Sequence, residues 1–162
     1  MIALAADART RAWRGFALAA LAVLVLDRAT KWLVVEAMDL RARGLIEVAP
    51  PYLDFVMAWN RGVNFGIGAG GPEAMRWVLA GVAVAVSAAL AWWTVRRRRD
   101  PRLALAAGVI AGGAVGNAWD RVQYGAVADF LNMSCCGIDN PYAFNVADIA
   151  IFAGAAFLAW KA

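Results

Sequence analysis

Four apolar stretches divide the chain, and more polar segments separate them. The stretches run from about 15 to 35, from 75 to 95, from 103 to 119 and from 142 to 160. A helix needs about 20 consecutive apolar residues to cross the hydrocarbon core of a bilayer, and each stretch comes near that length, although the third is short. The pattern therefore predicts an all-α integral membrane protein with four transmembrane helices.

The composition favours the same interpretation. Apolar residues make up 63% of the 162 residues and charged residues 17%, and the mean hydropathy is +0.59. Soluble domains average about 45–50% apolar and about 25% charged residues, and a soluble domain of this size could not bury so much apolar surface. We expect one membrane-embedded domain over residues 1–162. The pI of 9.6 does not indicate nucleic-acid binding, because the basic residues are not spread over a soluble face.

Missing residue types exclude several kinds of catalysis. The chain has no histidine, which excludes catalysis by His, haem ligation through His and zinc sites that use His. Its two cysteines, Cys135 and Cys136, are adjacent. They therefore make no disulfide framework and are too few for a zinc site of four thiolates. We expect neither a metal nor a cofactor.

Basic residues predict the orientation in the membrane. With four spans, both termini and the connection between the second and third spans share one side, and these segments hold nine of the sixteen basic residues. The run Arg96–Arg99 would keep its connection in the cytoplasm. We therefore expect both termini inside and the connections 36–74 and 120–141 outside. The first of these contains β-branched and aromatic runs at 45–48 and 52–59, which are typical of short strands.

Polar residues in and beside the spans gather at one depth, the outer interface. An ionisable residue inside a span is costly and usually functional. The polar residues at this depth are Asp27, Lys31, Asn60, Asn117, Asp120, Arg121, Asp129, Asn145 and Asp148. Asp27 and Lys31 are four apart with the acid first, the favourable order for a helical ion pair. Gly108, Gly112 and Gly116 form a ridge of small residues that brings the third span close to the fourth or to the first.

Asp129 and Asp148 are the best candidates for catalysis. Two carboxylates held close together in a low-dielectric site cannot both ionise, so one activates a water while the other, still protonated, polarises a carbonyl. Such a pair hydrolyses peptide bonds without His, Ser or metal. Three alternatives stay open: a Ser134–Lys31 nucleophile, a small proton-coupled transporter that uses the same carboxylates, and a non-enzymatic assembly subunit.

Several motifs resemble the signature sequences of lipoprotein signal peptidase (signal peptidase II). They are the Asp–Lys pair of Asp27-Arg28-Ala29-Thr30-Lys31, then Asn60–Gly66, Gly112–Arg121, Gly125–Phe130 and Phe144–Asp148. They follow the family's order on a four-span layout, in a chain of family length. Asn64 departs from the small residues that are common at its position in the family, and we expect its side chain to face the interface.

The resemblance implies an aspartic endopeptidase of the bacterial cytoplasmic (inner) membrane. It would cleave diacylglyceryl-modified prolipoproteins just before the lipidated cysteine, and its expected partners are these substrates and membrane lipids, with the enzyme a monomer. The family fold adds a small extracytoplasmic β-cradle and a short interfacial helix to the four spans. By position, the catalytic pair falls on Asp129 and Asp148. Positions that bind substrate or orient the pair fall on Asn60, Asn117, Arg121 and Asn145, and supportive positions on Asp27, Lys31, Gly62 and Asp120.

Overall fold

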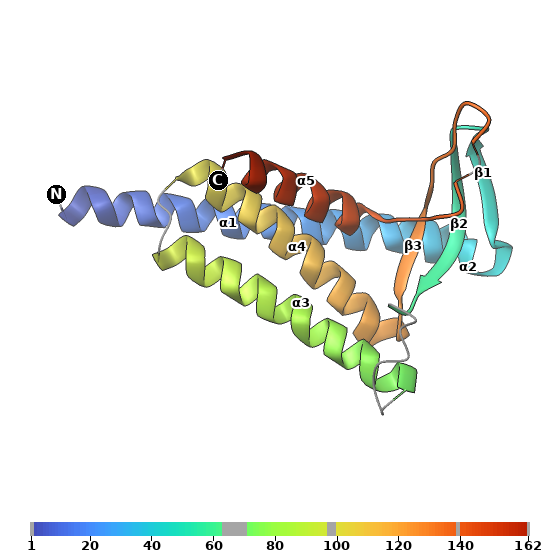
Figure 1. Ribbon diagram of the computed structural model, residues 1–162, viewed down its shortest axis with the longest axis horizontal. Coiled ribbons are helices and arrows are strands. Elements are labelled where there is room, and N and C mark those ends of the chain that lie inside the picture. The colour runs from blue at the N-terminus through green and yellow to red at the C-terminus, as the bar shows by residue number, and fades with distance from the viewer. Residues whose placement is uncertain (1, 63–70, 97–99, 139, 162) are drawn as a thin grey trace.

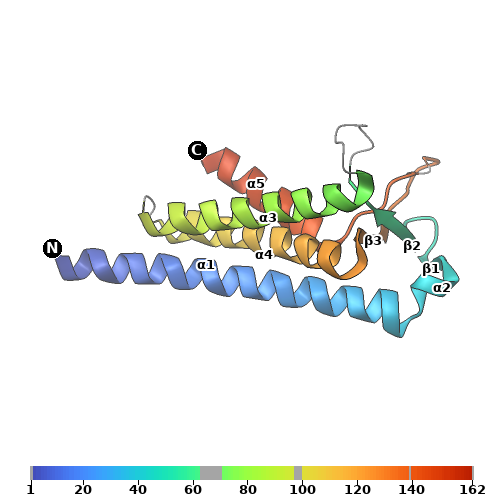
Figure 2. The same cartoon turned by 90° about the horizontal axis from the view of Figure 1, so that it is seen from below.

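The computed structural model describes residues 2–62, 71–96, 100–138 and 140–161. Within these residues, long helices lie side by side and a small sheet stands at one end of the bundle (Figure 1). The elements in chain order are α1 (Ile2–Lys31), the π-helical segment η1 (Trp32–Ala37), α2 (Leu40–Arg43), β1 (Leu45–Ala49), β2 (Leu53–Asn60), α3 (Gly71–Arg96), α4 (Pro101–Tyr124), β3 (Val127–Asn132) and α5 (Val146–Lys161). Helix α1 begins, and α5 ends, away from the sheet (Figure 2).

Two of the described helices are long and apolar enough to cross a membrane, over Glu73–Arg96 and Pro101–Tyr124. They correspond to the second and third predicted spans. Large apolar side chains on the long helices point outward, among them Leu18 on α1, Val82 on α3 and Phe152 on α5. Apolar side chains on the outside of a bundle are what a lipid environment requires.

The first and fourth predicted spans differ from the helices at their ends. Helix α1 already begins at Ile2, and its α-helical hydrogen bonding ends at Lys31, where η1 takes over. Helix α5 begins at Val146, four residues later than the predicted Tyr142. The reason is that Phe144 exchanges backbone hydrogen bonds with Leu131 of β3 and is thereby held in an extended conformation.

Helix α4 is the centre of the bundle, because α1, α3 and α5 all pack against it. The glycine ridge faces α1: a side chain at Gly108 would collide with the backbone of Phe16, and one at Gly112 with that of Ala20. The neighbouring Gly113 faces Ala147 of α5 instead. The sequence left open whether the glycine ridge of the third predicted span packs against the fourth or the first. The structure shows it against the first, since the ridge of α4 faces α1.

Gly116 gives a stability prediction for this close packing. A Cβ built there would lie 2.6 Å from Asp27 Oδ2, a buried carboxylate with no room to move. We expect Gly116→Ala to lower the free energy of unfolding by about 1–3 kcal/mol, as overpacking does. Gly81→Ala is the matched control, because a Cβ there meets nothing within 4 Å and alanine favours a helix by up to about 1 kcal/mol. Thermal melts of both variants in detergent check this, and equal melting temperatures would contradict it.

The sheet has three antiparallel strands in the order β1-β2-β3. Its first two strands confirm the prediction of strands near 45–48 and 52–59, whereas β3 was not anticipated from the sequence. Ala58 of β2 pairs with Asp129 of β3, and Asn60 pairs with Val127. Phe130 on the same strand packs with Val34 and Leu40 in a buried cluster. This cluster fixes the sheet to the end of the bundle and so fixes the position of Asp129.

Candidate active site

Asp129 and Asp148 come from different elements and meet at one residue, Asn145. Asp129 lies on β3 and is 4% exposed, and Asp148 lies in the first turn of α5. Asn145 immediately precedes α5 and is fully buried. Its Nδ2 donates to Asp129 Oδ1 at 2.6 Å. The structure thus brings together two carboxylates that the sequence separates by 19 residues.

Asn145 also begins helix α5. The Asp148 amide donates to Asn145 Oδ1 at 3.0 Å, and the Asn145 amide donates to Asp148 Oδ2 at 3.2 Å. This reciprocal arrangement is a capping box, which satisfies amides that the helix start would otherwise leave free. The same arrangement fixes the Asp148 carboxylate at the positive end of the helix dipole, where a negative charge is favoured.

Asn117 of α4 holds Asp148 from the other side. Its Nδ2 donates to Asp148 Oδ1 at 2.8 Å, while its Oδ1 accepts from Asn145 Nδ2 at 3.3 Å and from Lys31 Nζ at 3.2 Å. Arg121 lies one turn further along α4, donates to the Asn117 carbonyl oxygen at 3.2 Å and is attracted to Asp129 and Asp148. The two asparagines therefore orient the carboxylates, and Arg121 adds a positive charge close to both.

Asn60, at the end of β2, reaches Asp129 through a side-chain hydrogen bond. Its Oδ1 accepts from the Gly62 amide at 2.9 Å, which turns the chain sharply. Gly62 has a φ of +89°, and a Cβ there would overlap the Leu79 side chain of α3, so glycine is the residue that fits this turn. Residues 63–66 of the same motif, with Asn64, lie outside the described residues.

Asp129 differs electrostatically from an ordinary aspartate. Burial and, after it, the nearby charge of Asp148 raise its pKa, which lies at about 6 instead of 3.8. Hydrogen bonds from Asn60 and Asn145 and the charge of Lys31 oppose this shift by stabilising the ionised form. Asp129 consequently keeps its proton over a pH range in which a solvated aspartate is ionised.

A buried cluster of four charges lies beneath these two carboxylates. Lys31 Nζ is 3.0 Å from Asp27 Oδ1 and 2.6 Å from Asp120 Oδ2. Arg28 completes the cluster through ion pairs with both Asp27 and Asp120. Asp27 and Asp120 are 0% exposed and Lys31 2%. The predicted ion pair between Asp27 and Lys31 is confirmed. The sequence did not predict that Arg28 takes part, although its position next to Asp27 could have indicated it.

The charge cluster holds the backbone beside each candidate catalytic residue. Asp120 Oδ2 accepts from the amide of Ala128, the residue before Asp129, at 3.2 Å. Asp27 Oδ1 accepts from the amide of Ala147, the residue before Asp148, at 3.2 Å. Asp27 and Asp120 are thus positioned to keep β3 and the start of α5 at a fixed separation.

The Ser134–Lys31 alternative is wrong. Ser134 Oγ donates to Asn132 Oδ1 at 3.4 Å and accepts from the Asn140 amide at 3.0 Å. Lys31 Nζ is enclosed by Asp27, Asp120 and Asn117 instead. Among the described residues, no group of three or more His, Cys, Asp or Glu side chains is arranged to hold a metal ion.

Residues 19–162 match the family described as Signal peptidase (SPase) II. A lipoprotein signal peptidase of Methylobacterium sp. (strain 4-46) is 49% identical over 144 residues, which cover 89% of this chain and 85% of that protein. Another, of Methylorubrum extorquens (strain PA1), is 43% identical over 143 residues, which cover 88% of this chain and 82% of the relative.

Two solved structures of a bacterial membrane enzyme, at 1.9 and 2.3 Å resolution, have similar folds. Their TM-scores are 0.74 and 0.70, each at 27% identity. The match to the 1.9 Å structure covers 89% of both chains. The match to the 2.3 Å structure covers 87% of this chain and 82% of the solved chain. With the sequence match along most of its length, the chain therefore belongs to the signal peptidase II family and is a membrane peptidase.

Proposed function

We propose that this chain is an aspartic endopeptidase that removes the signal peptide from diacylglyceryl-modified prolipoproteins, with Asp129 and Asp148 as its catalytic pair. The observation that carries the proposal is the hydrogen bonding of Asn145 to both carboxyl groups. The substrate class is supported by relatives that are named lipoprotein signal peptidases. The transporter alternative has no support among these relatives.

The two carboxyl groups have complementary roles in this mechanism. Asp148, held at the helix N-terminus where a negative charge is favoured, removes a proton from a water that attacks the scissile carbonyl carbon. Asp129, which is protonated below its raised pKa of about 6, donates a hydrogen bond to the carbonyl oxygen as negative charge develops there. Asp148 then passes its proton to the leaving amine, and the peptide bond breaks. No covalent intermediate is required.

The surrounding residues orient this pair. Asn117 and Asn145 hold the carboxylates, while Arg121 and Asn60 are placed to contact the substrate backbone or its carbonyl oxygen. Asp27, Lys31 and Asp120 support the two backbone segments, and Gly62 supports the turn after β2. Hydrogen bonds support the roles of Asn117, Asn145, Asp27 and Asp120, whereas the roles of Arg121 and Asn60 follow their positions in the family's motifs.

The membrane placement completes the proposal. Four spans with both termini in the cytoplasm would put the sheet, as a cradle, and the active site at the extracytoplasmic interface of the inner membrane. Arg96 and Arg102 support this orientation, since they lie at the ends of α3 and α4 away from the sheet, where the positive-inside rule requires them (Figure 1). At the interface, acyl chains of the substrate stay in lipid while water reaches the peptide bond. In this proposal the chain is a single domain and acts as a monomer. Helix α2 is the short helix that lies at the membrane interface.

The pH dependence of cleavage tests the assignment of the acid. Because Asp129 has a raised pKa of about 6 and acts in its protonated form, kcat/KM is expected to fall as the pH rises through this value. Asn60→Ala removes a hydrogen bond that lowers the pKa of Asp129, so this decline should move to higher pH. The measurement is kcat/KM for a lipidated prolipoprotein between pH 5 and 9, with titration assigned to the pair jointly. A flat profile, or a decline that moves to lower pH in Asn60→Ala, would contradict the assignment.

A further inference from the structure

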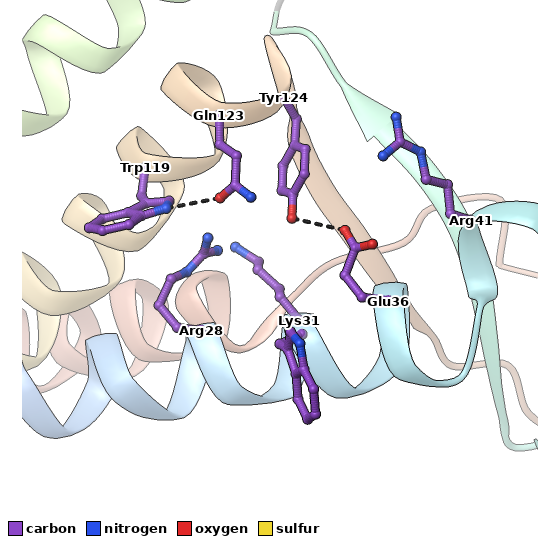
Figure 3. Close-up of a pocket in the computed structure, with 8 residues that line it drawn as sticks. Arg28, Lys31, Glu36, Arg41, Trp119, Gln123 and Tyr124 are labelled. Carbon is purple, nitrogen blue, oxygen red and sulfur yellow. Dashed lines mark hydrogen bonds between the residues drawn. The ribbon is translucent and has the colours of Figure 1, made fainter.

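A polar groove lies at the sheet end of the bundle, between the C-terminal ends of α1 and α4, and neither Asp129 nor Asp148 lines it. Its volume is about 710 Å³. The side chains that matter below are Arg28, Glu36, Arg41, Trp119, Gln123 and Tyr124. Figure 3 shows Arg28 and Lys31 rising from α1 toward Gln123 and Tyr124, with Glu36 and Arg41 on the side nearer the sheet.

Two charged side chains of this groove, Arg41 and Glu36, are available to bind a charged ligand. Arg28 and Lys31 are neutralised by Asp27 and Asp120 beneath the groove. Arg41 contacts the Trp59 ring at 5.6 Å, and no carboxylate of the described residues forms an ion pair with it. Among the described residues, the Glu36 carboxylate accepts a hydrogen bond only from the Tyr124 hydroxyl, at 3.1 Å. A ligand that complements these two groups therefore carries both a negative and a positive charge.

The groove also has donors that lack acceptors. Arg28 Nε is buried and has no hydrogen-bond partner among the described residues, a costly state for a polar atom. Gln123 uses its Oε1 to accept from Trp119 Nε1 at 2.9 Å, which leaves its Nε2 to donate into the groove. With the Arg41 guanidinium, these donors suit an oxyanion such as a phosphodiester.

An apolar groove of about 460 Å³ adjoins the polar one. Trp119 lines both, and the apolar groove continues between α3 and α4 beside Gly81, Val84 and Val115. Trp77 and Val84 of α3 are seven positions apart, which is about 10 Å of helix at about 1.5 Å per residue. The groove is thus an apolar channel that leads from the charged groove along the outside of the bundle.

We propose that the two grooves together bind one membrane phospholipid with a phosphoethanolamine headgroup. Its phosphate lies between Arg41, Arg28 Nε and the Gln123 amide, and its primary ammonium donates to the free carboxylate oxygen of Glu36. One acyl chain follows the apolar groove along α3 and α4. A polar groove that adjoins an apolar one at Trp119 matches the chemistry of such a lipid. Diacylglycerol has neither charge and does not match the polar groove.

Binding to the purified full-length chain tests this proposal. After delipidation in detergent, phosphatidylethanolamine, phosphatidylglycerol and diacylglycerol with identical acyl chains are titrated in turn, and bound lipid is counted by native mass spectrometry. We expect phosphatidylethanolamine to bind about tenfold more tightly than phosphatidylglycerol, because one well-formed charged contact changes affinity by about this factor. Diacylglycerol, which also lacks the phosphate, should bind more weakly than either. Equal binding of all three lipids, or tighter binding of phosphatidylglycerol, would overturn the proposal.

Substitutions separate the two grooves. Glu36→Gln should abolish the preference for phosphatidylethanolamine over phosphatidylglycerol, and Arg41→Gln should weaken both by about tenfold. Gly81→Leu should fill the apolar groove and weaken all three lipids, since a Cβ there meets no other atom within 4 Å. Arg43→Gln and Ala85→Leu, on the same helices and exposed outside both grooves, are the matched controls. Unchanged binding in Glu36→Gln and in Gly81→Leu would overturn the site even if Arg41→Gln failed to fold.

Discussion

Asp129→Asn and Asp148→Asn are each expected to fold and to lose cleavage of a lipidated prolipoprotein. Asparagine is nearly isosteric with aspartate, but it neither gives up nor takes up a proton as a carboxyl group does. General acid–base groups contribute about 10²- to 10⁴-fold to rate, so kcat should fall by about 10³-fold or more in each variant. Single-turnover cleavage with purified enzyme in detergent measures this.

The effects of the two substitutions should not add. Because both groups act in one proton-transfer unit, the double variant should be about as inactive as either single variant. Asp39→Asn is the control, since Asp39 is exposed in the turn before α2 and touches neither carboxyl group. A variant at position 129 or 148 that retains near wild-type kcat while melting normally would remove that residue from the catalytic pair.

Lys31→Met is expected to have the largest effect on stability. The substitution leaves Asp27 and Asp120, both 0% exposed, with Arg28 as their remaining partner in the ion cluster. Breaking a buried ion pair by removing one member costs about 3–5 kcal/mol, because a charge stays buried without compensation. Since the same cluster accepts hydrogen bonds from Ala128 and Ala147, any folded fraction should also cleave more slowly.

Unfolding in detergent, followed by a melt or by denaturant, measures the stability of Lys31→Met. The chain's other lysine provides the matched control, because Lys161 is exposed at the end of α5, where its ammonium lies 4.2 Å from the centroid of the Trp160 ring. Lys161→Met should unfold like the wild type. If Lys31→Met unfolds at the wild-type midpoint, the charge cluster does not carry the stability assigned to it.

Local features of the site were predictable where they depend on helical spacing. The four-residue interval between Asp27 and Lys31 predicted their ion pair, and the glycine ridge of α4 predicted a close helix contact. Apolar length alone predicted α3 and α4 well. It predicted the start of α5 poorly, because Asn145 begins that helix through a capping box and Phe144 pairs with β3.

Contacts between segments far apart in the chain were not predictable from spacing. Arg28 pairs with Asp120 across 92 residues, and no periodicity relates these two positions. Strand β3 was missed because its pairing with β2, rather than its own short sequence, makes it a strand. Reasoning from the residues chose Asp129 and Asp148 among the acids at this depth, and the family resemblance gave the same pair. Their catalytic role remains a prediction that their geometry supports.

The mass of the cleavage product tests the central claim most directly. Purified enzyme is given one prolipoprotein in two forms, with and without diacylglycerol on the cysteine that follows the expected cleavage site. The account predicts that the wild type converts only the lipidated form, into a product that begins with the modified cysteine, and that Asp129→Asn and Asp148→Asn convert neither form. Cleavage at another bond, equal cleavage of the unmodified form, or the same product from either variant would contradict it.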